Sequence, residues 1–184
     1  MKALLIIDMQ VESFKPETPR FDSAAIVQRI NLLSDYFRQN GDKVVFIQHD
    51  GTKENSYVPD TAGWEILPAL NQYLDDIVIG KTANDSFYNT KLDIVLKENK
   101  ITDLFITGCA TDFCVDSTVH SALTRDYNVV VIKDCHTTAD RPHLSAEKVI
   151  QHHNWLWENL TPTKGRIKLV TAKDLLKNQM HSGK

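Results

Sequence analysis

The residue types best suited to chemistry in this chain are a carboxylate, an ammonium and a thiol, each shortly after a strand-like apolar run. Asp8 stops the apolar run 3–7, Lys81 follows Ile-Val-Ile-Gly, and Cys114 comes after the fourth such run. In an open parallel sheet the carboxyl ends of the strands meet at one edge, so the three side chains could converge there. A thiol beside a cation and a proton acceptor predicts a cysteine nucleophile.

Cys114 stands out among the three cysteines because a helix is expected to begin at it. The partial positive charge of a helix N-terminus, together with a nearby lysine, favours the thiolate. The alternative is that Cys114 only packs, as most free cysteines do. Cys109 lies within the fourth strand and is expected in the core. Cys135 precedes His136, but neighbours in sequence rarely face each other, so we do not expect a second catalytic pair there.

Length and composition are those of one globular domain spanning residues 1–184. Of the 184 residues, 42% are hydrophobic and 24% charged, which is enough for a core on both faces of a sheet. A net charge of -3 provides no basic surface for nucleic acid. No apolar run approaches the roughly 20 residues that cross a bilayer. We therefore expect a cytoplasmic protein with reduced thiols and neither nucleic acid nor membrane as a partner.

Strand-like and helix-like patterns alternate along the chain and predict a doubly wound α/β fold. The expected strands are mostly continuous runs of Val, Ile and Leu, typical of strands buried on both faces: 3–7, 43–48, 77–79, 104–107, 129–132 and 167–170. Between them lie helical stripes such as Ile26, Ile30, Leu33 and Phe37. Residues 50–68 form a long irregular connection that could supply one wall of a pocket.

Three short motifs occur in a specific order: Asp-Met-Gln at 8–10, Lys81, and Gly-Cys-Ala-Thr-Asp-Phe-Cys-Val at 108–115. Together they resemble the signature of the isochorismatase-like cysteine hydrolases, and the resemblance covers nearly the whole chain. It implies a three-layer α/β/α sandwich with a six-stranded parallel sheet. It also implies that Asp8, Lys81 and Cys114 form a catalytic triad.

The resemblance assigns a role to each site residue. Lys81 would stabilise the thiolate, while Asp8 would accept the thiol proton, return it to the leaving amine and later activate water. The backbone N–H groups of Thr111 and Cys114 would bind the oxyanion. The peptide bond between Ala110 and Thr111 would be cis. Both charges of the triad are expected at strand ends rather than in the core.

Cysteine rather than glycine at position 114 makes the chain similar to the amidase branch of the family. The run 134–140, with the later His-His-Asn at 152–154, resembles the subset that includes streptothricin hydrolase and opens amide or lactam bonds. The expected substrate is therefore a small carboxamide or lactam. The residues expected to contact it are Phe14, His49, Trp64, Phe87, Tyr88 and Ala110.

Nicotinamidases of this family bind a metal through an Asp-x-His and a further His after the second strand. Here His49 and Asp50 are present without that spacing, so we expect no metal and no cofactor. Nicotinamidase-like activity stays an alternative, as does a catalytically silent binding or scaffold protein of the same fold. A thiol redox sensor is a third possibility. The resemblance also implies a homo-oligomer, most simply a dimer. We expect the loop 50–68 and the helix bearing Trp155 and Trp157 to contribute to its interface, because two tryptophans two positions apart cannot both face the same core.

Overall fold

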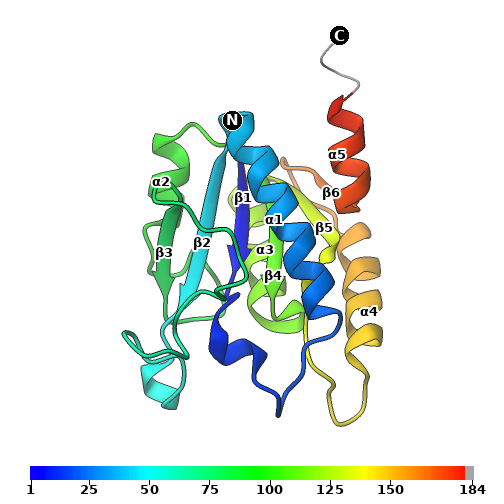
Figure 1. The fold of residues 1–184 in the computed structure, drawn as a ribbon. Coiled ribbons are helices and arrows are strands. Elements are labelled where there is room, and N and C mark those ends of the chain that lie inside the picture. The colour runs from blue at the N-terminus through cyan, green and yellow to red at the C-terminus, as the bar shows by residue number, and fades with distance from the viewer. Residues whose placement is uncertain (181–184) are drawn as a thin grey trace.

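Six parallel strands form one sheet in the order β3-β2-β1-β4-β5-β6. The computed structural model describes residues 1–180 (Figure 1). The strands are β1 (Lys2–Ile7), β2 (Lys43–His49), β3 (Ile77–Lys81), β4 (Asp103–Cys109), β5 (Asn128–Thr137) and β6 (Ile167–Val170). The predicted parallel six-stranded sheet is thereby confirmed, and each predicted strand lies within an observed one.

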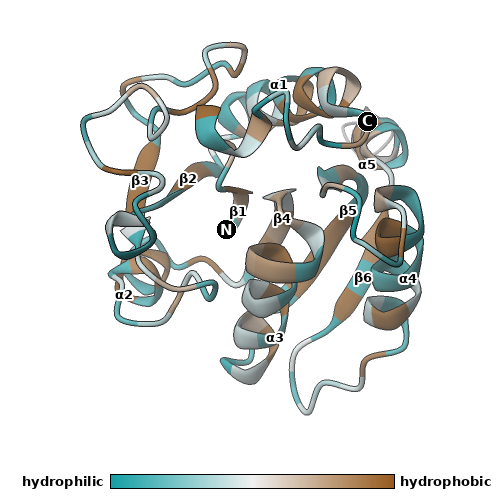
Figure 2. Ribbon diagram, turned by 90° about the horizontal axis from the view of Figure 1, so that it is seen from below, coloured by the Kyte–Doolittle hydropathy of each residue, from teal (hydrophilic) through white to brown (hydrophobic). Residues whose placement is uncertain are grey.

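Helices cover both faces of the sheet and complete three layers. The helices are α1 (Ser23–Gln39), α2 (Leu92–Glu98), α3 (Asp116–Thr124), α4 (Ala146–Glu158) and α5 (Ala172–Met180). The two apolar cores assign α1 and α5 to one face and α2, α3 and α4 to the other. Figure 2, a view along the strands, shows α1 and α3 on opposite sides of the sheet. No helix in the described residues is long and apolar enough to cross a membrane.

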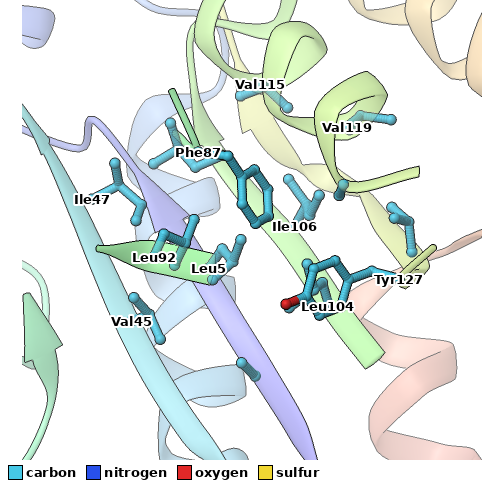
Figure 3. Packing of buried hydrophobic residues seen from close by; sticks show 14 of the residues in the cluster. Leu5, Val45, Ile47, Phe87, Leu92, Leu104, Ile106, Val115, Val119 and Tyr127 are labelled. Carbon is cyan, nitrogen blue, oxygen red and sulfur yellow. The ribbon is translucent and has the colours of Figure 1, made fainter. Parts of the chain in front are cut away.

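Two apolar cores lie on opposite sides of the sheet because successive side chains of a strand point to opposite faces. Leu5 and Ile7 of β1 belong to the core under α2, α3 and α4, part of which is drawn in Figure 3. Leu4 and Ile6 belong to the core under α1 and α5. The predicted stripe on α1 is fully part of this second core. The all-apolar sequence of β1 thus follows from burial on both faces.

The helix α4 separates its two tryptophans, as residues two positions apart on a helix must be. Trp157 is fully buried, and its Nε1 donates to Asp116 Oδ1 at 2.8 Å. Trp155 is 61% exposed. The prediction that only one tryptophan would lie in the core is confirmed.

Gly108 allows the carboxyl ends of β1 and β4 to lie side by side. It pairs with Ile7 and has a φ of +120°. A Cβ atom at this position would lie 2.2 Å from the Ile7 carbonyl oxygen. Only glycine fits there. The close approach of the two strands at Gly108 places the residue after β1 near the segment after β4.

Candidate active site

Lys81, at the end of β3, lies between Asp8 and Cys114. Its Nζ is 2.7 Å from Asp8 Oδ2 and 3.3 Å from Cys114 Sγ. It also donates to the Ala83 carbonyl oxygen at 2.9 Å and lies 3.4 Å from His49 Nδ1. The three residues singled out in the sequence are therefore in contact, although 73 and 33 positions separate Lys81 from the other two.

The Asp8–Lys81 ion pair is buried, contrary to the expectation that both charges lie at strand ends outside the core. The side chain of Lys81 is 0% exposed and that of Asp8 6%. The loops that follow β1 and β2 cover this edge of the sheet, and Gln10 ties them together. Its side chain accepts from the His49 N–H and donates to the carbonyl oxygens of His49 and Trp64. A strand end is exposed only where no loop folds over it.

Burial changes the electrostatics of the thiol relative to the sequence-based expectation. Burial raises the pKa of Cys114 well above its ordinary value, the Asp8 carboxylate raises it further, and Lys81 offsets only part of this. Burial alone would lower the pKa of Lys81, but Asp8 and Cys114 hold it above its ordinary value. The expected resting thiolate is therefore wrong. Cys114 rests as a thiol beside an ion pair, so it needs a proton acceptor when it reacts.

Asp8 supplies a free acceptor atom. Its Oδ2 binds Lys81, whereas its Oδ1 is buried and has no hydrogen-bond partner within the described residues. The residue has a φ of 47°, a conformation that Asp tolerates better than most side chains. Its N–H donates to the Ile47 carbonyl oxygen at 2.9 Å, which extends the sheet pairing by one residue. The carboxylate is thus fixed by backbone contacts with one oxygen available for a proton.

Cys114 lies inside a helical turn rather than at its first residue. The turn η3 (Thr111–Val115) precedes α3, and the Val115 N–H donates to the Ala110 carbonyl oxygen, five residues earlier. The helical segment therefore begins three residues before the predicted start. Such π-type turns are frequent at functional sites, but a short apolar sequence pattern does not reveal them.

A hydrogen-bond chain that runs from the half-buried Asn154 into the interior fixes Thr111. Asn154 Nδ2 donates to the Lys133 carbonyl oxygen, so its Oδ1 is the atom that accepts from His136 Nε2 at 3.1 Å. His136 Nδ1 then accepts from the Thr111 hydroxyl at 2.9 Å. Burial lowers the pKa of His136 to about 4, so the imidazole is neutral at neutral pH. Sequence reasoning gave His136 no such role.

The cis peptide bond lies one position earlier than the family resemblance implied. It joins Cys109 to Ala110, not Ala110 to Thr111. The bond falls between the last residue of β4 and the extended Ala110, whereas Thr111 already belongs to the helical turn.

Asp8 and Cys114 line a cavity of about 210 Å³. Its lining comprises Asp8, Ser13, Arg20, His49, Tyr57, Asn84, Cys109, Ala110, Phe113, Cys114 and Arg141. Sequence reasoning missed Arg20, Tyr57, Asn84 and Arg141, which lie in loops outside any periodic pattern. Asn84 lies beside the thiol, with its Oδ1 3.6 Å from Cys114 Sγ.

Only two of the six residues expected to contact substrate line this cavity, His49 and Ala110. Phe87 is 5% exposed and stacks on Tyr127 in the core. Phe14 packs against the core under α1. Phe87 is buried and Phe14 half-buried because the connecting segments that carry them fold back onto the scaffold.

The remaining two aromatic residues also lie outside the cavity lining. Trp64 is half-buried, with a buried Nε1 that has no partner among the described residues. Tyr88 is 58% exposed. The aromatic rim predicted from the sequence is therefore wrong for Phe14, Trp64, Phe87 and Tyr88.

His49 and Asp50 make contacts other than to a shared metal. His49 Nδ1 faces the Lys81 ammonium, and burial and Lys81 together lower its pKa. Asp50 Oδ1 accepts from the hydroxyl and N–H of Thr52 at 2.5 and 3.0 Å. Within the described residues, no three His, Cys, Asp or Glu side chains cluster in a way that could hold a metal ion. Independence from metal stays a prediction.

The other two cysteines are buried like Cys114, but neither is hydrogen-bonded to Lys81 as Cys114 is. Burial raises the pKa of Cys109 to about 11. Cys135 belongs to the core under α1, and burial also raises its pKa. His136 points to the other side of β5, toward Thr111 and Trp157. Adjacent residues of a strand face opposite sides, so the Cys135–His136 pair does not form, as predicted.

The chain is similar in sequence to known hydrolases. A model of the isochorismatase domain matches residues 2–161 of the chain. Streptothricin hydrolase of Streptomyces noursei is 30% identical over 142 residues, covering 77% of this chain and 56% of that protein. The ureidoacrylate amidohydrolase RutB of Methylobacterium radiotolerans is 37% identical over 82 residues, covering 44% of this chain and 32% of that protein. The chain thus spans little more than half of one relative and a third of the other.

Among solved structures, an isochorismatase-family protein from Chromobacterium violaceum superposes with a TM-score of 0.86 at 26% identity. The match covers 97% of this chain and 93% of that one. The three-layer arrangement is therefore shared over almost the full length of both chains.

Proposed function

Since the chain belongs to the isochorismatase family, we propose that this hydrolase cleaves a C–N amide bond of a small carboxamide or lactam through a thioester on Cys114. The observation that carries the proposal is the position of Lys81 Nζ, in contact with both Asp8 Oδ2 and Cys114 Sγ. Burying two charges is costly, and a scaffold that only binds has no need of a buried ion pair against a thiol. One relative, RutB, is an amidohydrolase, which supports amide cleavage.

In the first step, the carbonyl carbon of the amide is attacked by Cys114 Sγ while the thiol proton moves to the Asp8 carboxylate. The proton acceptor is needed because burial and Asp8 raise the pKa of the thiol. Lys81 stabilises the negative charge that develops on sulfur. The carbonyl oxygen becomes an oxyanion, for which we propose the N–H groups of Thr111 and Cys114 as donors.

Collapse of the tetrahedral intermediate breaks the C–N bond. The leaving nitrogen takes the proton from Asp8, which leaves a thioester on Cys114. A carboxamide releases ammonia or an amine at this step, whereas the amine of an opened lactam stays attached to the acyl group. Water then attacks the thioester while Asp8 accepts a proton from it. The Cys114 thiolate leaves and regains that proton, and the carboxylic acid is released. The complete reaction consumes one water and requires neither an oxidant nor a reductant.

The proposal is tested with a panel of small carboxamides and lactams. Ammonia is measured for the carboxamides, and a mass gain of one water for the lactams. We expect wild type to hydrolyse at least one compound and Cys114→Ala to lose at least about 10⁴-fold in kcat. Adding EDTA is expected to leave the rate unchanged, because His49 faces an ammonium and Asp50 binds Thr52.

Three outcomes would contradict the proposal. Equal rates for wild type and Cys114→Ala would exclude the thiol as nucleophile. Turnover that is lost in EDTA and restored by zinc, manganese or iron would favour the nicotinamidase-like alternative. Binding of panel compounds without hydrolysis would favour the silent binding protein.

A further inference from the structure

Each charged side chain that lines the cavity forms an ion pair with a group of opposite charge, with one exception among the described residues. Asp8 pairs with Lys81 at 2.7 Å. Arg141 binds Asp112 through two bonds, from Nε to Oδ2 at 2.7 Å and from Nη2 to Oδ1 at 2.8 Å. Arg20 is the exception, since no carboxylate within the described residues lies within ion-pair distance of it.

Arg20 is oriented by the backbone rather than by a carboxylate. Its Nε donates to the Ser13 carbonyl oxygen at 2.5 Å, and no hydrogen bond to a described residue is made by its two terminal nitrogens. Glu17 and Asp140 line a neighbouring hollow together with Arg20, but neither forms an ion pair with it. The guanidinium is thus held in place with its terminal N–H groups available.

The uncharged members of the lining leave the charge of Arg20 uncompensated. Burial and Lys81 lower the pKa of His49, so its imidazole is neutral at neutral pH. Burial raises the pKa of Tyr57, so its phenol stays protonated. The cavity therefore carries one excess positive charge, and this charge comes from a group whose planar fork matches a carboxylate.

We infer that the substrate carries a carboxylate in addition to the scissile amide, and that Arg20 binds this carboxylate while Cys114 attacks the amide carbon. The inference rests on the proposed function and narrows its substrate class. A cavity of about 210 Å³ lies below the roughly 300–1,000 Å³ of sites for drug-sized ligands. The substrate class is accordingly a small amide of a dicarboxylic or amino-carboxylic acid.

The inference can be tested without knowing the substrate, because iodoacetate and iodoacetamide alkylate the same thiol and differ in one carboxylate. The rate of each at Cys114 is measured at one pH by peptide mass spectrometry. The rate with iodoacetate is divided by the rate with iodoacetamide, and this ratio is then divided by the corresponding ratio for free glutathione to give a normalised ratio. Both reagents need the same thiolate, so the pKa of Cys114 cancels from this normalised ratio.

We expect the normalised ratio to be well above one in wild type and to fall as salt concentration rises. In Arg20→Gln it should fall roughly tenfold, as expected for loss of a hydrogen-bonded charge, while the iodoacetamide rate changes little. Arg20→Lys should retain part of the preference. Arg125→Gln is the matched control, because Arg125 lies over the Phe87 ring outside the cavity lining.

The results separate this inference from the function on which it rests. A wild-type ratio equal to that of glutathione, or a ratio unchanged in Arg20→Gln, would overturn the carboxylate inference while iodoacetamide labelling still identified Cys114 as the reactive thiol. Failure of both reagents to label Cys114 would overturn the proposed nucleophile, and the inference with it. The wild-type measurement stands even if an Arg20 variant does not fold.

Discussion

At the scale of single residues, the chemistry of Cys114 depends on two neighbours of opposite charge. Burial and Asp8 raise the pKa of the thiol, whereas Lys81 lowers it. Replacing either neighbour should therefore shift that pKa in a known direction. A change of one pKa unit changes the thiolate fraction tenfold at any pH well below the pKa.

The midpoint pH of iodoacetamide alkylation should be lower in Asp8→Asn than in wild type and higher in Lys81→Met. At neutral pH, Asp8→Asn should then be alkylated faster than wild type, although its turnover should fall about 10²- to 10⁴-fold because the proton acceptor is lost. Urea unfolding is needed beside each profile, since removing one partner of a buried ion pair costs about 3–5 kcal/mol. If wild type and both variants gave the same alkylation profile, the triad would be refuted.

The sequence reveals Asp8, Lys81 and Cys114 because each follows a recognisable strand and belongs to a specific motif. It does not reveal their burial, which depends on loops that no periodic pattern describes. Arg20 and Arg141 were missed for the same reason. Phe87 shows a related limit: an aromatic residue in a connection can either rim a cavity or pack on the scaffold, and here it packs in the core.

At the scale of elements, the site depends on how closely the ends of β1 and β4 approach. Gly108→Ala should destabilise the protein by at least about 1–3 kcal/mol, because the residue has a positive φ and its Cβ would meet the Ile7 carbonyl oxygen. Gly80→Ala in β3 is the matched control, since no atom lies within 4 Å of its Cβ position. The urea unfolding midpoints of the two variants are compared. Equal stabilities of Gly108→Ala and Gly80→Ala would contradict the close approach of β1 and β4 at Gly108.

A second element-scale contact joins β5, α4 and the turn η3 through His136. The folded state needs a neutral imidazole there, with a pKa of about 4 against 6.5 when unfolded. Its contribution to stability is complete above pH 6.5 and is lost as pH falls toward 4, by up to about 3 kcal/mol.

His136→Gln removes this titration, so the stability of wild type relative to the variant should shrink between pH 7 and pH 4. Urea unfolding at several pH values measures the difference, and acidic groups that titrate equally in both proteins cancel. A difference independent of pH would mean that His136 is not buried in the neutral form.

The strands were predictable because continuous apolar runs are typical of buried parallel strands. β5 was underestimated, since Lys133 and Asp134 interrupt its apolar run, yet the strand continues to Thr137. Pairing of His136 and Thr137 with Gly108 and Cys109 of β4 extends it. Such pairing between distant residues has no local signal.

At the scale of the whole molecule, we predict a symmetric homodimer whose interface includes Trp155 of α4. This large apolar side chain is 61% exposed, and closed two-fold contacts are the commonest form of assembly. Sedimentation at micromolar concentration should show a dimer, and Trp155→Lys should shift it toward the 20.9 kDa monomer. A monomer in the wild-type protein would contradict assembly, and a dimer unaffected by the substitution would place the interface elsewhere.

If an amide is hydrolysed through a thioester on Cys114, that thioester can be trapped. The panel compound that is hydrolysed fastest is mixed with wild type, the reaction is quenched in acid, and the protein is mapped by mass spectrometry. We predict an added acyl mass on Cys114 that hydroxylamine removes and that Cys114→Ala lacks. Rapid hydrolysis with no acyl group on Cys114, or with the acyl group on another residue, would exclude Cys114 as the nucleophile.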